Sequence, residues 1–398
     1  MSFAIFVWTP FPHAYLALYL ALILAALVTP PSPHRRLFFV PILVLTWRLI
    51  HDAQAGYFTS TLWFGYLLVA SDYILLTDVQ RELHQVPDTA DSRSTRVTIR
   101  NIEYAPLKAR IKWALQLFIS PRGVGWEHEP RSAIPSGAPP NTPRIKFIIR
   151  QSACLVVAFL CFDIMNLHLR WNPAFYARMG MVSAGWTWRF VGTAGFGMGA
   201  AAALSTVHYT LSIIFVALGV SVPQDWPPLF GDLASATSVR AFWSRSWHQL
   251  FRRSLCAHAK IISGTILGMP DRSTISLCVQ GCCAFMLSGL VHYLGETVPM
   301  KLGRSGSLIF FGIQPIGIAL ETLAGTLAQR AGVQLPRTAS QALGWMWVFA
   351  WFSSTLPIMQ DPLIKTGQMD SRVDVSLIMG LSRGMWVLPS GRINLFGV

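Results

Sequence analysis

The stretch 275–294 reads ISLCVQGCCAFMLSGLVHYL and contains no aspartate, glutamate, lysine or arginine. An α-helix needs about 20 mostly apolar residues to cross the hydrocarbon core of a bilayer, so this stretch has the length and composition of a transmembrane helix. Similar apolar stretches recur along the chain, at 13–30, 37–50, 57–77, 146–167, 187–220, 274–295, 308–329 and 341–358, with a weaker one at 374–389. The sequence therefore predicts an all-α integral membrane protein with about eight transmembrane helices, within a range of roughly seven to nine.

The composition agrees with this prediction. Of the 398 residues, 53% are hydrophobic and 13% are charged, whereas soluble domains average about 25% charged residues. The formal net charge of +14 would suggest nucleic-acid binding in a soluble protein, but here the basic residues lie between apolar blocks, where the positive-inside rule puts them. We therefore expect the lipid bilayer as a partner and no nucleic acid, and the sequence leaves the oligomeric state open.

The distribution of basic residues also predicts an orientation in the membrane. The long loop at 78–145 is basic, whereas the loop between the second and third apolar stretches has no lysine or arginine. This alternation puts the N-terminus on the lumenal or outer side and the long loop in the cytosol. Within that loop, 103–119 has the pattern of an amphipathic helix at the membrane surface. Because we find no internal repeat and no second domain, we expect 1–398 to form a single domain.

The apolar stretch 187–220 is unusual in its length and in its glycines. This stretch is too long for one simple span, so we expect either one long helix or a broken one. The Gly-x-Gly-x-Gly pattern at 195–199 has no strand before it, which a nucleotide-binding turn would need. Close packing against another helix is therefore the favoured role of these glycines.

An unusual segment follows that stretch and opens a motif region at 226–295. It begins with WPPLFG at 226–231, where two prolines and a glycine forbid a continuous helix, and continues as SVRAFWSRSWHQLFRR at 238–253. On a helical wheel the second part has an aromatic face with Trp243 and Trp247, and a basic face with Arg245, His248 and Arg252. Such a helix suits a membrane boundary or a polar cavity. An ordinary juxtamembrane helix with positive-inside charge would show the same distribution of aromatic and basic residues on the wheel.

His292 lies near the end of the uncharged stretch at 275–294. Ionisable groups at membrane depth are costly to place, so such a histidine is a functional candidate. Ser288 precedes it by one helical turn on the same face and can reach it with a hydrogen bond. Glu296 follows by one turn and either orients the imidazole or marks the water boundary. The alternative is a histidine at the membrane interface that is hydrated among the lipid headgroups.

These residue types together allow one kind of chemistry. A neutral histidine with a pKa near 6.5 is a natural general base at neutral pH, and it can take the proton of an alcohol that attacks a thioester. A second polar group, here His248, can orient the donor or stabilise the oxyanion. Arginines can hold the phosphates of coenzyme A. No cysteine and histidine cluster has the spacing of a zinc site, so we expect no metal.

At these residues the chain resembles the wax synthase branch of the membrane-bound O-acyltransferase superfamily. More narrowly, it looks like the fungal wax-synthase-like acetyltransferases that act on terpenoids and meroterpenoids. The resemblance rests on WPPLFG at 226–231, on Arg-x-Phe-Trp-x-x-x-Trp-His-Gln at 240–249 and on Ser-x-x-x-His at 288–292. His292 matches the catalytic histidine of the family. His248 stands where the wider superfamily often has asparagine, which leaves its role open between catalysis, donor positioning and structure.

The resemblance implies a mostly helical membrane fold around a reaction chamber, in the endoplasmic reticulum. It further implies transfer of acetyl from acetyl-CoA, or of another acyl group from its acyl-CoA, to a hydroxyl of a terpenoid or meroterpenoid in secondary-metabolite biosynthesis, with no bound cofactor. A long-chain wax ester synthase or a sterol O-acyltransferase would share every motif, and a membrane transporter is the alternative from another class. The candidate catalytic residues are His292 and His248, and the candidate substrate or coenzyme A binding residues are Arg240, Trp243, Arg245, Trp247, Arg252 and Ser288.

Overall fold

A computed structural model describes residues 10–52, 56–86, 101–270, 273–300, 305–370 and 373–389. Within these ranges the chain forms helices, turns and two isolated bridges, and no longer strand. The helices are α1 (Pro10–Val28), α2 (Phe39–His51), α3 (Tyr57–Ser71), α4 (Val79–Glu82), α5 (Leu107–Ile119), α6 (Arg144–Trp171), α7 (Pro173–Tyr176), α8 (Trp186–Ala217), α9 (Val239–Ala241), α10 (Arg252–Lys260), α11 (Thr274–Met300), α12 (Ser307–Gly312), α13 (Gln314–Arg330), α14 (Arg337–Lys365) and α15 (Leu377–Arg383).

Six of the described segments are long and apolar enough to cross a membrane: Tyr57–Leu76, Arg144–Trp171, Trp186–Ala217, Thr274–Val298, Ser307–Arg330 and Arg337–Lys365. The two apolar helices before them, α1 and α2, are shorter. The weaker candidate at 374–389 contains only the seven-residue helix α15, which is too short to span a bilayer. The prediction of an all-α membrane protein is confirmed, with six clear spans and two shorter apolar helices.

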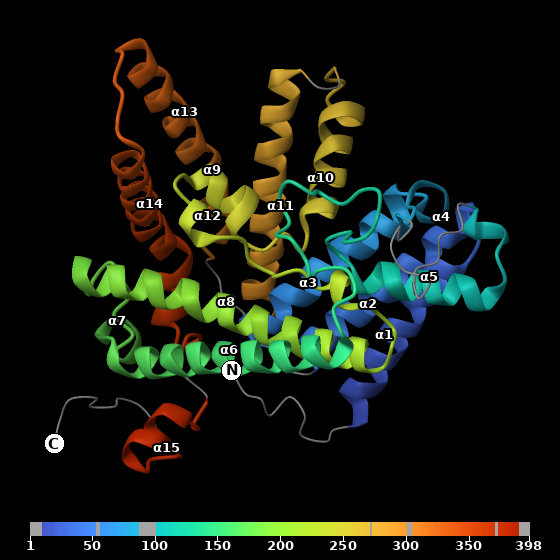
Figure 1. Cartoon of the computed structure of the whole chain (residues 1–398), viewed down its shortest axis with the longest axis horizontal. Helices are drawn as coiled ribbons and strands as arrows, with labels where there is room; N and C mark the ends of the chain where they lie inside the picture. Colours follow the sequence, from blue (N-terminus) through green and yellow to red (C-terminus); the bar gives the residue numbers. More distant parts are fainter. Residues whose placement is uncertain are drawn as a thin grey trace.

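The stretch at 187–220 forms one continuous helix, α8, of 32 residues. In Figure 1, α8 lies along α6 over most of its length. Gly195 and Gly199 of α8 face His168 and Met165 of α6, and a Cβ at either glycine would lie within 2.7 Å of the facing side chain. The glycines therefore allow the two helix backbones to approach closely, as the sequence predicts.

Among the described residues, the N-terminal helices form the largest cluster of buried apolar side chains. Buried side chains of α1, α2, α3 and α5 pack there, among them Trp113 and Leu117 of α5. The helix predicted at 103–119 is thus present as α5, and its apolar face packs against α1. Its position at the cytosolic membrane surface stays a prediction.

The segment 238–253 is not the single two-faced helix that the wheel predicts. Helix α9 and the π-helical turn Phe242–Ser246 end at Trp247, whose backbone is extended (φ −75°, ψ 154°), and α10 begins only at Arg252. The side-chain amide of Gln249 donates to the carbonyls of Trp243 and Trp247 at 3.0 and 2.7 Å. These bonds satisfy carbonyls that the broken helix leaves without partners.

A second contact explains why the break is stable. The Arg252 guanidinium donates to the Ser244 carbonyl at 3.0 Å and to Gln249 Oε1 at 2.9 Å. Gly231 of the WPPLFG segment donates its backbone N–H to the Ser246 carbonyl at 3.0 Å. A Cβ at Gly231 would lie 2.1 Å from the Arg245 carbonyl oxygen, so only glycine permits this approach.

Candidate active site

A cavity of about 1350 Å³ lies between α3, α6, α8, α9, α10, α11, α12 and α14. Apolar and aromatic side chains make up most of its wall, and His248 and His292 both line it. Pockets for single small molecules typically measure about 300–1,000 Å³, so this cavity has room for more than one small ligand. The fold therefore brings together two histidines that lie more than forty positions apart in the chain.

His292 is held on two sides. Its Nδ1 and the hydroxyl of Tyr57 lie 2.7 Å apart, which is a short hydrogen bond. Its ring stacks on Phe311, with centroids 4.7 Å apart and planes inclined by 25°. Because Nδ1 is occupied, Nε2 is the nitrogen that is left for a molecule in the cavity.

The hydrogen-bond partner of His292 is neither Ser288 nor Glu296, the two neighbours that the sequence suggests. Ser288 lines the cavity, but the hydrogen bond of His292 in the described structure goes to Tyr57 of α3. Glu296 is fully buried and accepts hydrogen bonds from the hydroxyls of Ser305 and Ser307, so it ties α11 to the beginning of α12. The described structure shows no hydrogen bond between Ser288 and His292, and Glu296 joins two helices.

Tyr57 is the site residue that sequence reasoning misses. It is the first residue of α3 and lies 235 positions before its histidine partner. Local spacing reports only neighbours within one helix or turn, so it carries no signal for this pair. The one available hint is that a tyrosine begins an apolar stretch, which is common at membrane interfaces and points to no particular partner.

His248 lies in the extended segment between Trp247 and α10. Its ring packs among Trp247, Phe230 and Phe251, with centroids 5.4, 6.1 and 6.4 Å away. Its Nδ1 is buried and has no hydrogen-bond partner among the described residues. Burial lowers the pKa of His248 to about 3, and the nearby His292 and Arg122 add to the decrease. The imidazole is therefore neutral at physiological pH.

Two tryptophans of the motif form an aromatic wall of the cavity. Trp243 donates its indole N–H to Gln314 Oε1 at 3.2 Å and packs edge-on against Phe285, with centroids 5.8 Å apart. Trp247 stacks on Phe242, with centroids 5.4 Å apart. Both tryptophans line the cavity, as do Arg240, Arg252 and Ser288. The wall is rigid because the rings support one another and Gln314 fixes one edge.

The three candidate arginines have different surroundings. Arg240 lines the cavity, is exposed, and donates to the Thr322 hydroxyl at 3.0 Å. Arg252 also lines the cavity, but its guanidinium holds the broken helix through Ser244 and Gln249. Arg245 is exposed and does not line the cavity. Of the three, Arg240 has the most freedom to meet a phosphate at the edge of the cavity.

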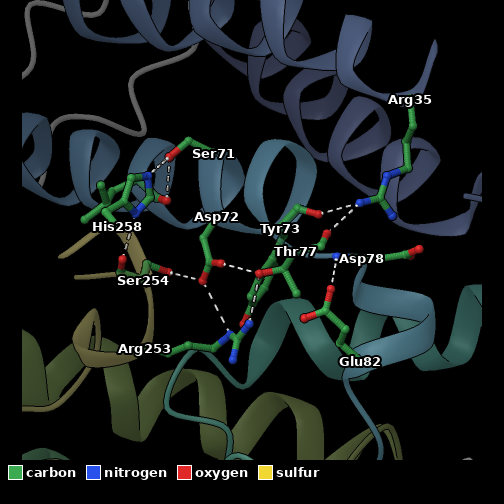
Figure 2. Close-up of polar contacts among 11 residues, drawn as sticks. Arg35, Ser71, Asp72, Tyr73, Thr77, Asp78, Glu82, Arg253, Ser254 and His258 are labelled. Atoms are coloured by element: carbon green, nitrogen blue, oxygen red, sulfur yellow. Dashed lines mark hydrogen bonds and ion pairs between the residues drawn. The ribbon is translucent and has the colours of Figure 1, made fainter. Parts of the chain in front are cut away.

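Arg253, next to Arg252, takes part in a separate polar network that Figure 2 shows. Its guanidinium forms an ion pair with the fully buried Asp72, with Nε and Oδ2 3.4 Å apart, and donates to the Thr77 hydroxyl at 3.1 Å. Asp72 also accepts from Thr77 and from Ser254, at 2.7 and 3.0 Å. This Asp72 network, consisting of Asp72, Thr77, Arg253 and Ser254, fixes α10 against the end of α3.

An apolar chamber with two histidines in a bundle of membrane helices has the groups that acyl transfer to a lipophilic alcohol needs. A family model described as membrane bound O-acyl transferase family matches residues 226–313. The chain is 33% identical to acetyltransferase ple2 of Rhodocybe pseudopiperita, over 96% of this chain and 98% of the relative. It is also 33% identical to acetyltransferase eriL of Hericium erinaceus, over 89% and 91%.

A more distant relative is acetyltransferase TRI7 of Fusarium sporotrichioides, 31% identical over 61% of each chain. No solved structure was found to match the chain. The full-length similarity to the first two relatives is decisive, and the chain belongs to the membrane-bound O-acyltransferase family. It is accordingly a multi-pass membrane enzyme that transfers acyl groups.

Proposed function

We propose that this enzyme transfers an acetyl group from acetyl-CoA to a hydroxyl of a terpenoid or meroterpenoid, in the endoplasmic reticulum membrane and as a step of secondary metabolism. The observation that carries the proposal is the presence of His248 and His292 on one large, mainly apolar cavity. The relatives named above are all called acetyltransferases, which supports acetyl as the transferred group. No feature of the cavity favours a long-chain wax ester synthase or a sterol acyltransferase.

His292 is the general base in this proposal. Its Nε2 takes the proton from the acceptor hydroxyl while that oxygen attacks the thioester carbonyl. The new C–O bond forms, the C–S bond breaks, and the proton returns from the imidazolium to the thiolate of coenzyme A. His292 suits this task because Tyr57 and Phe311 fix its ring at the cavity wall.

His248 stabilises the charge that develops on the thioester oxygen. A neutral imidazole has one N–H to donate, and the low pKa of His248 keeps it neutral in the folded enzyme. Its neighbours are the aromatic rings of Phe230 and Trp247, and in such apolar surroundings a hydrogen bond to an oxyanion is worth more than in water.

The size and chemistry of the cavity support an acceptor that is large and apolar. An acetyl group occupies little of about 1350 Å³, so most of the space is left for the acceptor and for the arm of the donor. Arg240 at the exposed edge offers a fixed positive charge to the phosphates of coenzyme A. The cavity takes residues from Tyr57 to Met359, which supports a single catalytic domain with the motif region 226–295 at its centre. In this proposal the basic loop 78–145 lies on the cytosolic side.

Microsomes that contain the enzyme, radiolabelled acetyl-CoA and a panel of hydroxylated terpenoids, sterols and fatty alcohols test this proposal. We expect a labelled ester from a terpenoid alcohol and none from the fatty alcohols. The same membranes with labelled palmitoyl-CoA provide the control for acyl length. An ester that forms only from fatty alcohols and palmitoyl-CoA would replace the proposal with a wax ester synthase.

A further inference from the structure

We propose that Tyr57 is a positioning residue that sets both the orientation and the tautomer of His292, and this inference rests on the proposed function. The hydrogen bond of 2.7 Å between the phenol oxygen and Nδ1 joins the beginning of α3 to the second half of α11. The two rings are inclined by 39°, with centroids 6.0 Å apart. Phe311 stacks on the imidazole, so the ring cannot turn without losing two contacts.

The tautomer matters because a neutral imidazole carries one proton on one of its two nitrogens. A general base must present an unprotonated nitrogen to the substrate, and here Nε2 is the nitrogen that Tyr57 leaves for it. His292 can therefore act only when Nδ1 carries the proton and donates it to an acceptor. The phenol oxygen of Tyr57 lies 2.7 Å from Nδ1, and we assign it as that acceptor.

The phenol then needs an acceptor for its own proton. Thr61 lies one helical turn after Tyr57 on α3 and lines the same cavity. Its hydroxyl oxygen is buried, has no hydrogen-bond partner within normal distance among the described residues, and lies beside the phenol. Nδ1 of His292 can thus donate to the phenol oxygen of Tyr57, and the phenol can donate to the Thr61 hydroxyl oxygen.

A neutral partner suits this place better than a carboxylate would. A charged group inside the membrane-spanning part of the protein costs far more free energy to desolvate than a phenol does. The nearby carboxyl of Glu296 accepts the hydroxyl protons of Ser305 and Ser307 and is therefore engaged elsewhere. Tyr57 takes the position that a carboxylate occupies behind the histidine of many hydrolases.

The helix that carries Tyr57 is held firmly at two further points. At its far end, the Asp72 network fixes it to α10 (Figure 2). Next to the Tyr57–His292 pair, a Cβ at Gly295 of α11 would lie 2.3 Å from Thr61 Oγ1, so α11 and α3 are in contact there. The phenol is consequently held against His292 by the packing of two helices and not by its own side chain alone.

The substitution Tyr57→Phe removes the phenol oxygen and keeps the ring. We expect kcat for acetyl transfer to fall by about 10- to 100-fold, while KM for acetyl-CoA changes less than about threefold, because ring orientation affects proton transfer and not donor binding. Tyr66→Phe is the matched control on the same helix, since Tyr66 packs on Phe118 and Phe251 and does not line the cavity. It is expected to leave both constants unchanged.

The outcomes separate this inference from the proposed function. Wild-type kcat in Tyr57→Phe, with His292→Ala inactive, overturns the role of Tyr57 and leaves the function standing. A raised KM with unchanged kcat would mean that the phenol binds substrate, which also overturns it. An active His292→Ala enzyme removes the proposed function itself. If Tyr57→Phe does not accumulate, Thr61→Val keeps the side-chain shape and removes the acceptor of the phenol proton; a wild-type kcat there contradicts the inference.

Discussion

The Asp72 network and the histidine pair of the cavity are both built from ionisable groups in an apolar helical protein, yet their polar atoms are satisfied differently. Both carboxylate oxygens of Asp72 accept from protein groups, on Thr77 and Ser254. Among the described residues, the buried Nδ1 of His248 has no hydrogen-bond partner, and His292 has one nitrogen bound to Tyr57 and one left for the cavity. Carboxylate oxygens that the protein satisfies hold the fold, whereas the ring nitrogen of His292 that it leaves available can meet a substrate.

The largest expected effect comes from His292→Ala, which removes the available nitrogen and no structural bond except that to Tyr57. We expect kcat to fall by about 10³- to 10⁴-fold, as for the loss of a general base. The amount of enzyme in the membrane and its Tm in detergent should stay close to wild type. Rates measured per mole of full-length protein check this. A fully active variant would show that His292 is not the base.

Asp72→Asn is the opposite case. It breaks the ion pair between Asp72 and Arg253 in the Asp72 network and leaves the residues of the cavity unchanged. Removal of one partner of a buried ion pair typically costs about 3–5 kcal/mol, and asparagine keeps part of the hydrogen bonding, so we expect about 2–3 kcal/mol. Tm in detergent should fall by several degrees. The rate per mole of folded enzyme should remain within about threefold of wild type. A normal Tm would mean that the network does not stabilise α10 against α3.

The pKa of His248 predicts how stability depends on pH. In the folded enzyme this pKa is lowered to about 3, chiefly by burial, whereas it is about 6.5 in the unfolded chain. Between these values the unfolded chain binds a proton that the folded one does not, so stability falls as the pH falls, and above pH 6.5 this effect is absent. From pH 6.5 to 5 the loss is about 2 kcal/mol.

His248→Gln removes this contribution and keeps a polar side chain. The decrease of Tm between pH 7.5 and pH 5 should therefore be smaller in the variant than in the wild-type enzyme. Scanning calorimetry or tryptophan fluorescence in detergent measures both. Equal decreases in the two proteins would contradict a buried, neutral His248.

The smallest expected effect distinguishes two arginines of the same motif. Arg240 lines the cavity, whereas Arg245 is exposed and lies away from it. Arg240→Ala should raise KM for acetyl-CoA by about three- to tenfold, because one charge-assisted contact to a phosphate is lost. Arg245→Ala should leave KM unchanged. Equal effects of the two substitutions would show that the donor does not approach along the edge that Arg240 forms.

The sequence predicts the class of fold and the two histidines, because hydropathy and local motifs are properties of neighbouring residues. It does not predict the break at Trp247. No proline or glycine interrupts 238–253, and the break depends on Gln249 and Arg252 folding back on backbone carbonyls. Nor does it predict the partner of His292, which comes from another helix 235 positions away. Both misses concern contacts between segments that only the packed structure brings together.

One measurement tests the comparison directly: the initial rate of acetyl transfer per mole of folded enzyme, for His292→Ala and Asp72→Asn side by side in detergent. Folded enzyme is counted as the monodisperse fraction that keeps native tryptophan fluorescence. We expect background rates for folded His292→Ala, and near wild-type rates for the smaller amount of folded Asp72→Asn. A fully active His292→Ala together with a folded but inactive Asp72→Asn would move the catalytic centre to the Asp72 network and contradict the account.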